Sequence, residues 1–414
     1  MPDTTYKAKL NKNLILAFFF PYVGYQYIKP VIDVYFSGFF ANNLGRLLAV
    51  GLVVTWFSIE CSRKWLQSKA YFLTFIFPIF LISIVGGTLS VEREVITLTD
   101  VFGGIYTILT TWTLYIITYS MIRRNPTLGD RVILFCAVLA IANSIVAIYG
   151  LISGESLIPD YEGIAFGFHE NTGRSVGYRA ENYVGFWTAP LVAYSLFYRR
   201  GLFDPIANGF LVVGIIAVVI SLSRTSWIST LVIFSFWWFW TYNKRRNAYF
   251  FILLAGLAII VIYFSVNFFQ IYLGNISSHL VEDNIKRLGG VDSKLEPWME
   301  WLSIFAANPL GVGPGGIQDI YQRGLTTLVP HSSLLDVAVE YGIFGLFVYC
   351  IPLWLLLRDA VEFVRSAKRN ITLGALIGVS LGMLVSLTVL SNPFLIIFFV
   401  FLGAVQGLKE TISY

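Results

Sequence analysis

The stretch best suited to chemistry runs from Pro330 to Gly345 and reads PHSSLLDVAVEYGIFG. A histidine, His331, stands at the mouth of a strongly apolar helix, and Asp336 and Glu340 lie four residues apart on one face of that helix. Ionisable residues inside a membrane helix are energetically expensive and are functional candidates by default. We therefore expect His331 and Glu340 to be catalytic, and Asp336 and Ser332 to bind substrate.

At a helix N-terminus the dipole disfavours imidazolium, so a neutral His331 that accepts a proton is plausible near neutral pH. The alternative is that His331 only caps the helix. The other two histidines, His169 and His279, are scattered singly without the spacing of metal ligands. The sequence therefore predicts neither a metal site nor a cofactor.

The polar stretch 153–182 carries two arginines, Arg174 and Arg179, and ends with Asn182 just before an apolar run. A guanidinium group can donate two parallel hydrogen bonds to the oxygens of a phosphate, so two arginines just before a membrane span suggest an anion site. The alternative is that they lie at the interface and pair with nearby glutamates. This stretch alone favours neither interpretation.

A lone arginine, Arg224, occurs within SLSRTSWIS at a turn between two apolar runs. Flanked by serines and with little loop to expose it, Arg224 is expected to face a protein cavity, where an ionisable residue is a functional candidate by default. A purely structural role at the interface is the alternative.

The longest polar stretch, 268–330, contains SKLEPWMEWLSIFAANP, which predicts an amphipathic helix. Ser293 and Glu296 have capping-box spacing, and an apolar stripe follows at helical spacing, which more often signifies packing than ligand contact. Lys294 would sit at the positive end of this helix, a ready anion site, and Arg287 is close by in sequence. The stripe consists of Leu295, Trp298, Trp301 or Leu302, and Phe305.

The glycine-rich segment NPLGVGPGG, residues 308–316, formally matches G-x-G-x-x-G. No strand precedes it, no βαβ unit surrounds it, and Pro314 falls inside the pattern, so a dinucleotide site is rejected. We expect a tight turn that leads toward His331.

The elements that must position these residues are membrane helices. The chain has 414 residues, of which 57% are hydrophobic and only 13% charged, so lipid must solvate most of it. A span needs ~20 apolar residues, and the sequence offers about twelve runs. Backbone groups in lipid must be satisfied internally, which predicts helices. The runs are roughly 12–29, 41–59, 71–89, 101–121, 132–152, 183–198, 207–222, 226–242, 248–267, 332–357, 372–390 and 393–408.

Charge sets the expected orientation. With the N-terminus in the cytoplasm, most of the 29 basic residues fall in inner segments, as the positive-inside rule expects, and both termini are cytoplasmic. No basic run resembles a nucleic-acid surface. We expect one all-α polytopic membrane domain, 1–414: scaffold spans (1–152), an outer loop (153–182), a large outer catalytic loop (268–330) and C-terminal spans (331–414).

Four separated motifs together resemble the O-antigen ligase and polymerase superfamily of bacterial envelope glycan assembly. Arg174, Gly177 and Asn182 match R-x-x-G…N, SLSRTSW matches a serine-rich S-R-[GT] turn, and NPLGVGPGG resembles the N-P…G-x-G approach. His331-Ser332, nine residues and then Gly342 and Gly345 match H-[NSQ]-x9-G-x-x-G, the most specific of the four. Where the family has arginine before the amphipathic helix, this chain has Lys294, and Arg287 is the alternative cation.

The resemblance implies a metal-independent glycosyltransferase of the bacterial cytoplasmic membrane with its site on the extracytoplasmic face. The donor would be a glycan on undecaprenyl diphosphate, and the acceptor a second lipid-linked repeat (polymerase) or a lipid A core (ligase). His331 would be the base, and Arg174, Arg179, Arg224, Lys294 and Arg287 would bind the diphosphate. A chain-length regulator is left open as a partner.

Two questions stay open. Polymerase is favoured over ligase only because no extended basic surface in the outer loops suits a phosphate-rich lipid A core. A lipid-linked glycan flippase or transporter is the rival from another class, since twelve spans with both ends inside is a common transporter layout. Against it, the two halves show no resemblance and the charges cluster in outer loops rather than at the midplane.

Overall fold

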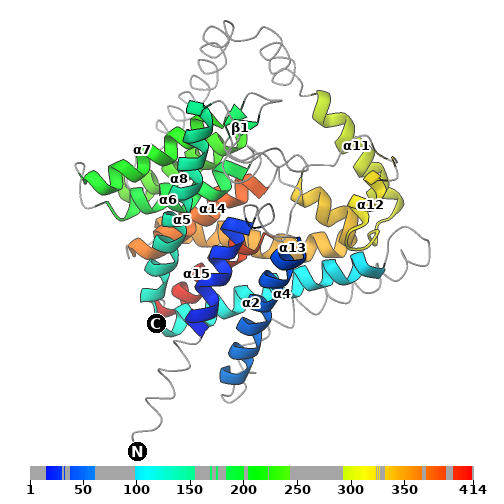
Figure 1. The fold of residues 1–414 in the computed structure, drawn as a ribbon, viewed down its shortest axis with the longest axis horizontal. Helices are drawn as coiled ribbons and strands as arrows, with labels where there is room; N and C mark the ends of the chain where they lie inside the picture. Colours follow the sequence, from blue (N-terminus) through cyan, green and yellow to red (C-terminus); the bar gives the residue numbers. More distant parts are fainter. Residues whose placement is uncertain are drawn as a thin grey trace, which may run out of the picture.

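The computed structural model describes residues 15–29, 32, 38–60, 98–153, 168–169, 174–175, 183–199, 204–221, 223–242, 292–322, 324, 326, 332–365, 370–387 and 395–412. Within these ranges the protein is helical apart from one small antiparallel ribbon (Figure 1). After a helical segment at 15–29, the elements in chain order are α2 (Gly38–Glu60), α4 (Leu98–Arg124), α5 (Thr127–Ser153), β1 (Phe168–His169), β2 (Arg174–Ser175), α6 (Val184–Phe197), α7 (Pro205–Ile220), α8 (Arg224–Tyr242), α11 (Asp292–Ala307), α12 (Gly316–Gln322), α13 (Ser333–Arg365), α14 (Ile371–Leu387) and α15 (Ile396–Ile412).

The helices follow the apolar runs of the sequence. Every run that falls within the described ranges is helical over its described part, which confirms the helical class, whereas the runs at 71–89 and 248–267 lie outside those ranges. Three of the described helices are long and apolar enough to cross a membrane, namely Gly103–Arg124, Thr127–Gly150 and Ser333–Arg365. The number of spans and their sidedness stay predictions.

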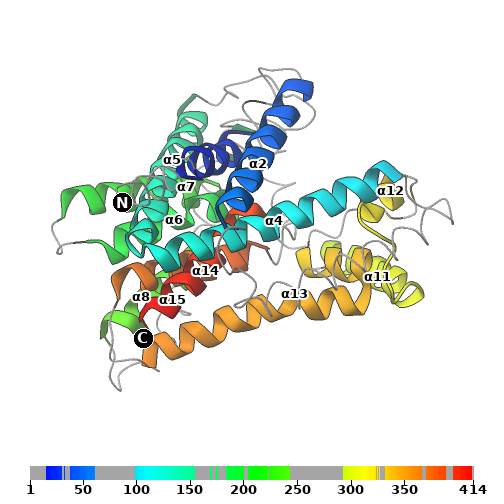
Figure 2. The ribbon, with the colours of Figure 1, turned by 90° about the horizontal axis from the view of Figure 1, so that it is seen from below.

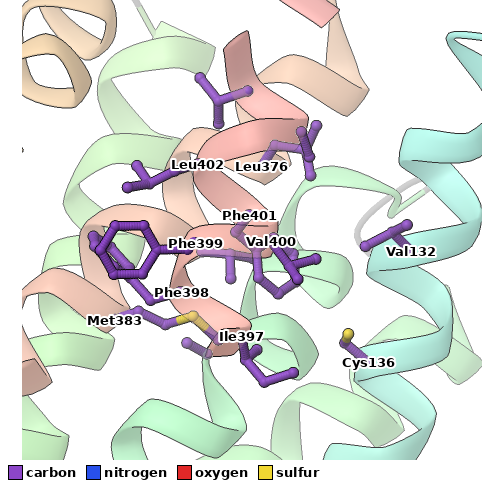
Figure 3. Close-up of a cluster of buried hydrophobic side chains, with 14 of the residues drawn as sticks. Val132, Cys136, Leu376, Met383, Ile397, Phe398, Phe399, Val400, Phe401 and Leu402 are labelled. Atoms are coloured by element: carbon purple, nitrogen blue, oxygen red, sulfur yellow. The ribbon is translucent and has the colours of Figure 1, made fainter. Parts of the chain in front are cut away.

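The core is built around α15. Its central residues Phe398, Phe399 and Phe401 are fully buried, and Figure 3 shows them with side chains of α14 and α5. A Cβ added to Gly403 would lie 2.3 Å from the carbonyl oxygen of Tyr115, so α15 and α4 pack with their backbones in near contact. Small residues at such crossings allow the dispersion contacts that hold membrane helices together.

Polar side chains join helix ends at one end of the bundle. Tyr198 after α6 and Thr372 at the start of α14 both donate a hydrogen bond to Asp130 in the first turn of α5. Asp359 near the end of α13 is 2% exposed and forms an ion pair with Lys409 of α15. This is the arrangement expected if these helix ends lie on the predicted inner face.

The longest helix, α13, runs across the molecule, and Figure 2 shows α11 and α12 gathered beside its N-terminal end. Both short helices contact α13. The segment between them, 308–315, is the glycine-rich stretch of the sequence, so the fold brings that stretch to the helix that carries the two predicted site carboxylates.

Candidate active site

A break in α13 defines the site. Gly342 has φ 68° and ψ −169°, which are not helical, so α13 consists of two helical halves joined at this residue. The N-terminal half carries Asp336 and Glu340. A break of this kind removes regular i to i+4 hydrogen bonds, and the backbone groups it frees must find other partners in a buried site.

The glycine-rich loop 308–315 supplies those partners. Val312 N–H donates to the carbonyl of Val339 (2.8 Å), and Gly313 N–H donates to the carbonyl of Glu340 (2.9 Å). In the opposite direction, Ile343 N–H donates to the carbonyl of Pro309 (3.0 Å). Three backbone bonds therefore replace the helical bonds lost at the kink, and they fasten the loop to α13.

Two glycines allow this close approach. A Cβ on Gly311, whose φ is 91°, would lie 2.4 Å from the carbonyl oxygen of Glu340. A Cβ on Gly342 would lie 2.4 Å from the carbonyl carbon of Leu310. Both neighbours are backbone atoms that cannot rotate away, so only glycine fits at either position. The N-P…G-x-G stretch and the first glycine of G-x-x-G are thus two sides of one structural unit.

Neighbouring helices hold the loop from two more sides. Trp301 of α11 is fully buried and packs with Val312 of the loop and Val339 of α13. On another side, a Cβ added to Gly104 of α4 would lie 2.1 Å from Cβ of Pro314, so the proline sits directly against that helix. The loop is therefore fixed between α11, α13 and α4, although Leu310 at its start is 54% exposed.

The amphipathic helix predicted over 293–309 is present as α11, which begins at Asp292. Trp301 and Phe305 belong to its packed face, as the stripe predicts, whereas Leu302 is 42% exposed, so Trp301 occupies the shared stripe position. The prediction that the stripe serves packing is confirmed for these two residues. The side chains of 292–297, which include Lys294, are outside the described part of the chain.

The two carboxylates of α13 differ in their surroundings. Oε1 of Glu340 accepts a hydrogen bond from the backbone N–H of Gly315 (2.9 Å). Asp336 is 3% exposed, and its Oδ1 has no hydrogen-bond partner among the residues that the structure describes. Burying two carboxylates about one helical turn apart disfavours the state in which both are charged, because the interior screens their repulsion poorly.

The start of α13 is also buried. Ser332 is 5% exposed and Ser333 is 1% exposed, and the carbonyl of Ser332 accepts the first helical hydrogen bond from Asp336 N–H (2.9 Å). Ser332 therefore occupies the N-cap position of α13. His331, the residue before it, lies outside the described ranges.

The serine-rich turn before α8 connects the starts of two helices, α8 and α6. Oγ of Ser226 accepts a hydrogen bond from Gly185 N–H (2.8 Å), which ties the start of α8 to the start of α6. Ser221, Ser223 and Ser226 are buried, and a Cβ on Gly185 would lie 2.4 Å from Cα of Ser226. The serines expected beside Arg224 thus stabilise the turn, and Arg224 is the first residue of α8.

The predicted outer loop 153–182 contains the one departure from an all-helical chain in the described ranges. Strands β1 and β2 pair antiparallel, with His169 opposite Arg174. Strand β2 contacts α5 and α7, the helix that leads into the serine-rich turn. The sequence does not predict this ribbon, because two-residue strands are too short to show an alternating pattern.

Most of the predicted cations cannot be placed relative to the carboxylates. For Arg174, Arg224 and Lys294 the structure describes only the backbone, and Arg179, Asn182, Arg287 and His331 lie wholly outside the described ranges. The described residues include no group of three or more His, Cys, Asp or Glu side chains that could hold a metal. The sequence does not predict that the backbone N–H of Gly315 donates a hydrogen bond to Glu340. The only sequence signal at that position is the Gly-Pro-Gly-Gly run of residues 313–316.

Comparison with known protein families gives a match to part of the chain. Residues 209–350 match the family model described as O-antigen ligase. This segment includes α8, α11, α12 and the N-terminal half of α13, and therefore the whole of the kink and its glycine-rich loop. No curated protein and no solved structure matches the chain.

Proposed function

Because residues 209–350 place this chain in the O-antigen ligase and polymerase family, we propose that it is a membrane glycosyltransferase that polymerises oligosaccharide repeat units carried on undecaprenyl diphosphate. The reaction would take place on the outer face of the bacterial cytoplasmic membrane. One observation carries the proposal: the family match covers the segment in which buried Asp336 and half-buried Glu340 lie on an apolar helix that a glycine-rich loop holds in place.

In the proposed reaction an acceptor hydroxyl attacks the anomeric carbon of the donor glycan. The new C–O bond forms as the bond between the anomeric carbon and the diphosphate oxygen breaks, with inversion, and undecaprenyl diphosphate leaves. The hydroxyl proton passes to His331 as general base, a role that typically contributes ~100- to 10,000-fold. Arg174, Arg179, Arg224 and Lys294 or Arg287 stabilise the charge on the leaving diphosphate. Asn182 and Ser332 contact substrate, and no metal takes part.

The ligase reaction is the second candidate, since the matched family model carries that description. It uses the same donor and the same bond changes but transfers the glycan to a lipid A core. We favour the polymerase because the outer loops of the sequence contain no extended basic surface for a phosphate-rich core. A flippase for the same lipid-linked glycan is the candidate from another class.

The size, the acceptor and the membrane side of the product distinguish these three functions. The full-length protein is expressed in a host that lacks its own enzymes of this type, a lipid-linked repeat is supplied, and the glycans are run on a size ladder. We expect a ladder of repeats for the wild type and none for His331→Ala or Arg224→Ala. His279→Ala, which removes another histidine of the outer loops, is the matched control and should retain the ladder.

Each alternative has its own result in this experiment. Transfer of glycan only to lipid A core would establish the ligase. Repeats that merely change sides of the membrane would establish the flippase. A His331→Ala variant that inserts normally and polymerises at the wild-type rate would contradict the assignment of the base.

A further inference from the structure

The two carboxylates of α13 have different hydrogen-bonding states, and this difference assigns them different roles. Asp336 and Glu340 are four residues apart, so both project from one side of the N-terminal half of α13. The inference below rests on the proposed glycosyl transfer and deepens it by naming the residue that binds the acceptor.

Glu340 is held by the loop through its backbone and its side chain. Its carbonyl accepts from Gly313 N–H (2.9 Å), and its Oε1 accepts from Gly315 N–H (2.9 Å). A residue fixed twice by the same loop is well suited to set the register between loop and helix. Because Oε1 of its carboxylate already accepts the hydrogen bond from Gly315, this group is less available to a substrate.

Asp336 has the opposite character. Its side chain is buried, yet its Oδ1 is without a hydrogen-bond partner in the part of the chain that the structure describes. Its place in the first turn of α13 lets the helix dipole stabilise a negative charge there. The dipole does not replace a hydrogen bond, and a buried acceptor left unsatisfied is costly.

A sugar hydroxyl is the chemistry that fits this oxygen. A carboxyl oxygen without a partner accepts a hydrogen bond, which a sugar hydroxyl can donate and an ionised diphosphate cannot. Asp336 also follows the proposed base, His331, by five residues in the sequence.

We propose that Asp336 binds a hydroxyl of the acceptor glycan, and that Glu340 is a positioning residue through which the loop 308–315 fixes the N-terminal half of α13. Loss of a hydrogen bond to a charged group weakens binding by about ten- to a hundredfold. Asp336→Leu, which cannot accept that bond, should therefore raise the KM for acceptor by about that factor and leave the KM for donor near the wild-type value.

The experiment requires donor and acceptor to be varied separately. The full-length protein is reconstituted in lipid nanodiscs with a lipid-diphosphate repeat whose accepting hydroxyl is methylated, so that it can only donate. The acceptor is the same repeat with a fluorescent alkyl group in place of the diphosphate, so that it can only accept; a core oligosaccharide replaces it if the ladder experiment establishes a ligase.

Matched variants separate binding from folding. Asp359→Asn removes another buried carboxylate of the same helix, bonded to Lys409 and Gln406, and should lower thermal stability without a change in acceptor KM. Glu340→Gln keeps an oxygen for Gly315 N–H and should stay within about tenfold of wild type in kcat/KM, whereas Glu340→Leu, which cannot accept that bond, should lose far more.

An unchanged acceptor KM in folded, active Asp336→Leu would overturn the assignment of Asp336, and loss of turnover in Glu340→Gln equal to that in Glu340→Leu would overturn the positioning role. If Asp336→Leu does not fold, Asp336→Ala is measured instead; failure of both to fold would show a structural residue and refute the proposal. Wild-type protein that transfers no glycan overturns the proposed function itself, and with it this assignment.

Discussion

Substitution of Gly342 by alanine tests how the loop and the kink depend on each other. The backbone of Gly342 (φ 68°, ψ −169°) lies in a region open essentially to glycine alone, where another residue costs about 1–3 kcal/mol. The added Cβ would also meet backbone atoms of Leu310 and Pro309 at 2.4 and 2.5 Å, so the loop must move away.

Movement of the loop would break its hydrogen bonds to α13. The three backbone bonds that join 309–313 to 339–343 contribute about 0.5–1.5 kcal/mol each. Strain and lost bonds together give a destabilisation of about 2.5–7.5 kcal/mol. Since whole proteins are stable by only about 5–15 kcal/mol, we expect release of the loop and loss of activity in Gly342→Ala.

Gly324→Ala is the matched control. Gly324 has the same φ of 68°, but an added Cβ would meet nothing within 4 Å, so this variant bears backbone strain of about 1–2 kcal/mol and no clash. Hydrogen exchange read by mass spectrometry on peptides covering 308–316 and 339–345 should show lost protection in Gly342→Ala alone. Equal protection and equal melting temperature in the two variants would refute the mutual dependence of loop and kink.

Three further outcomes are expected. Ser226→Ala leaves the buried N–H of Gly185 without its acceptor and should destabilise the protein by about 1–3 kcal/mol, whereas Ser235→Ala, which removes only a bond within α8, should have little effect; thermal melts in detergent compare them. Lys409→Met removes one of the two cations that, in the described ranges, pair with the buried carboxylate of Asp359 and leaves the more exposed Arg358 as the other, so it should lower the melting temperature, with partial recovery when Asp359→Asn is added. Turnover in excess chelator should equal turnover in its absence, and a dependence on added divalent cation would contradict the metal-independent reaction.

Much of this protein follows from local sequence. Runs of apolar residues about as long as a bilayer is thick predict helices, because backbone groups in lipid must bond within their own segment. The helical spacing of apolar residues likewise predicted α11, in which Trp301 of the stripe faces the core. Rejection of a dinucleotide site at 308–316 also holds in the described ranges, since a helix and not a strand precedes that loop.

The roles of individual site residues depended on tertiary structure. From sequence alone Asp336 and Glu340 are equivalent in kind, two carboxylates on one helical face. What separates them is the N–H of Gly315, a backbone group that every residue except proline possesses and that leaves no mark in a pattern of side chains. Likewise, Gly311 and Gly342 are recognisable as turn or kink residues, but that they face each other emerges only when the loop docks on α13.

The sequence by itself therefore determined which segments are helices, which of them are apolar enough for lipid, and which residue types could do chemistry, because each of these depends on neighbours within a few turns of chain. Tertiary structure alone decided which carboxylate is held, because Oε1 of Glu340 accepts a hydrogen bond from the backbone N–H of Gly315, 25 residues away, whereas Oδ1 of Asp336 has no partner among the residues that the structure describes.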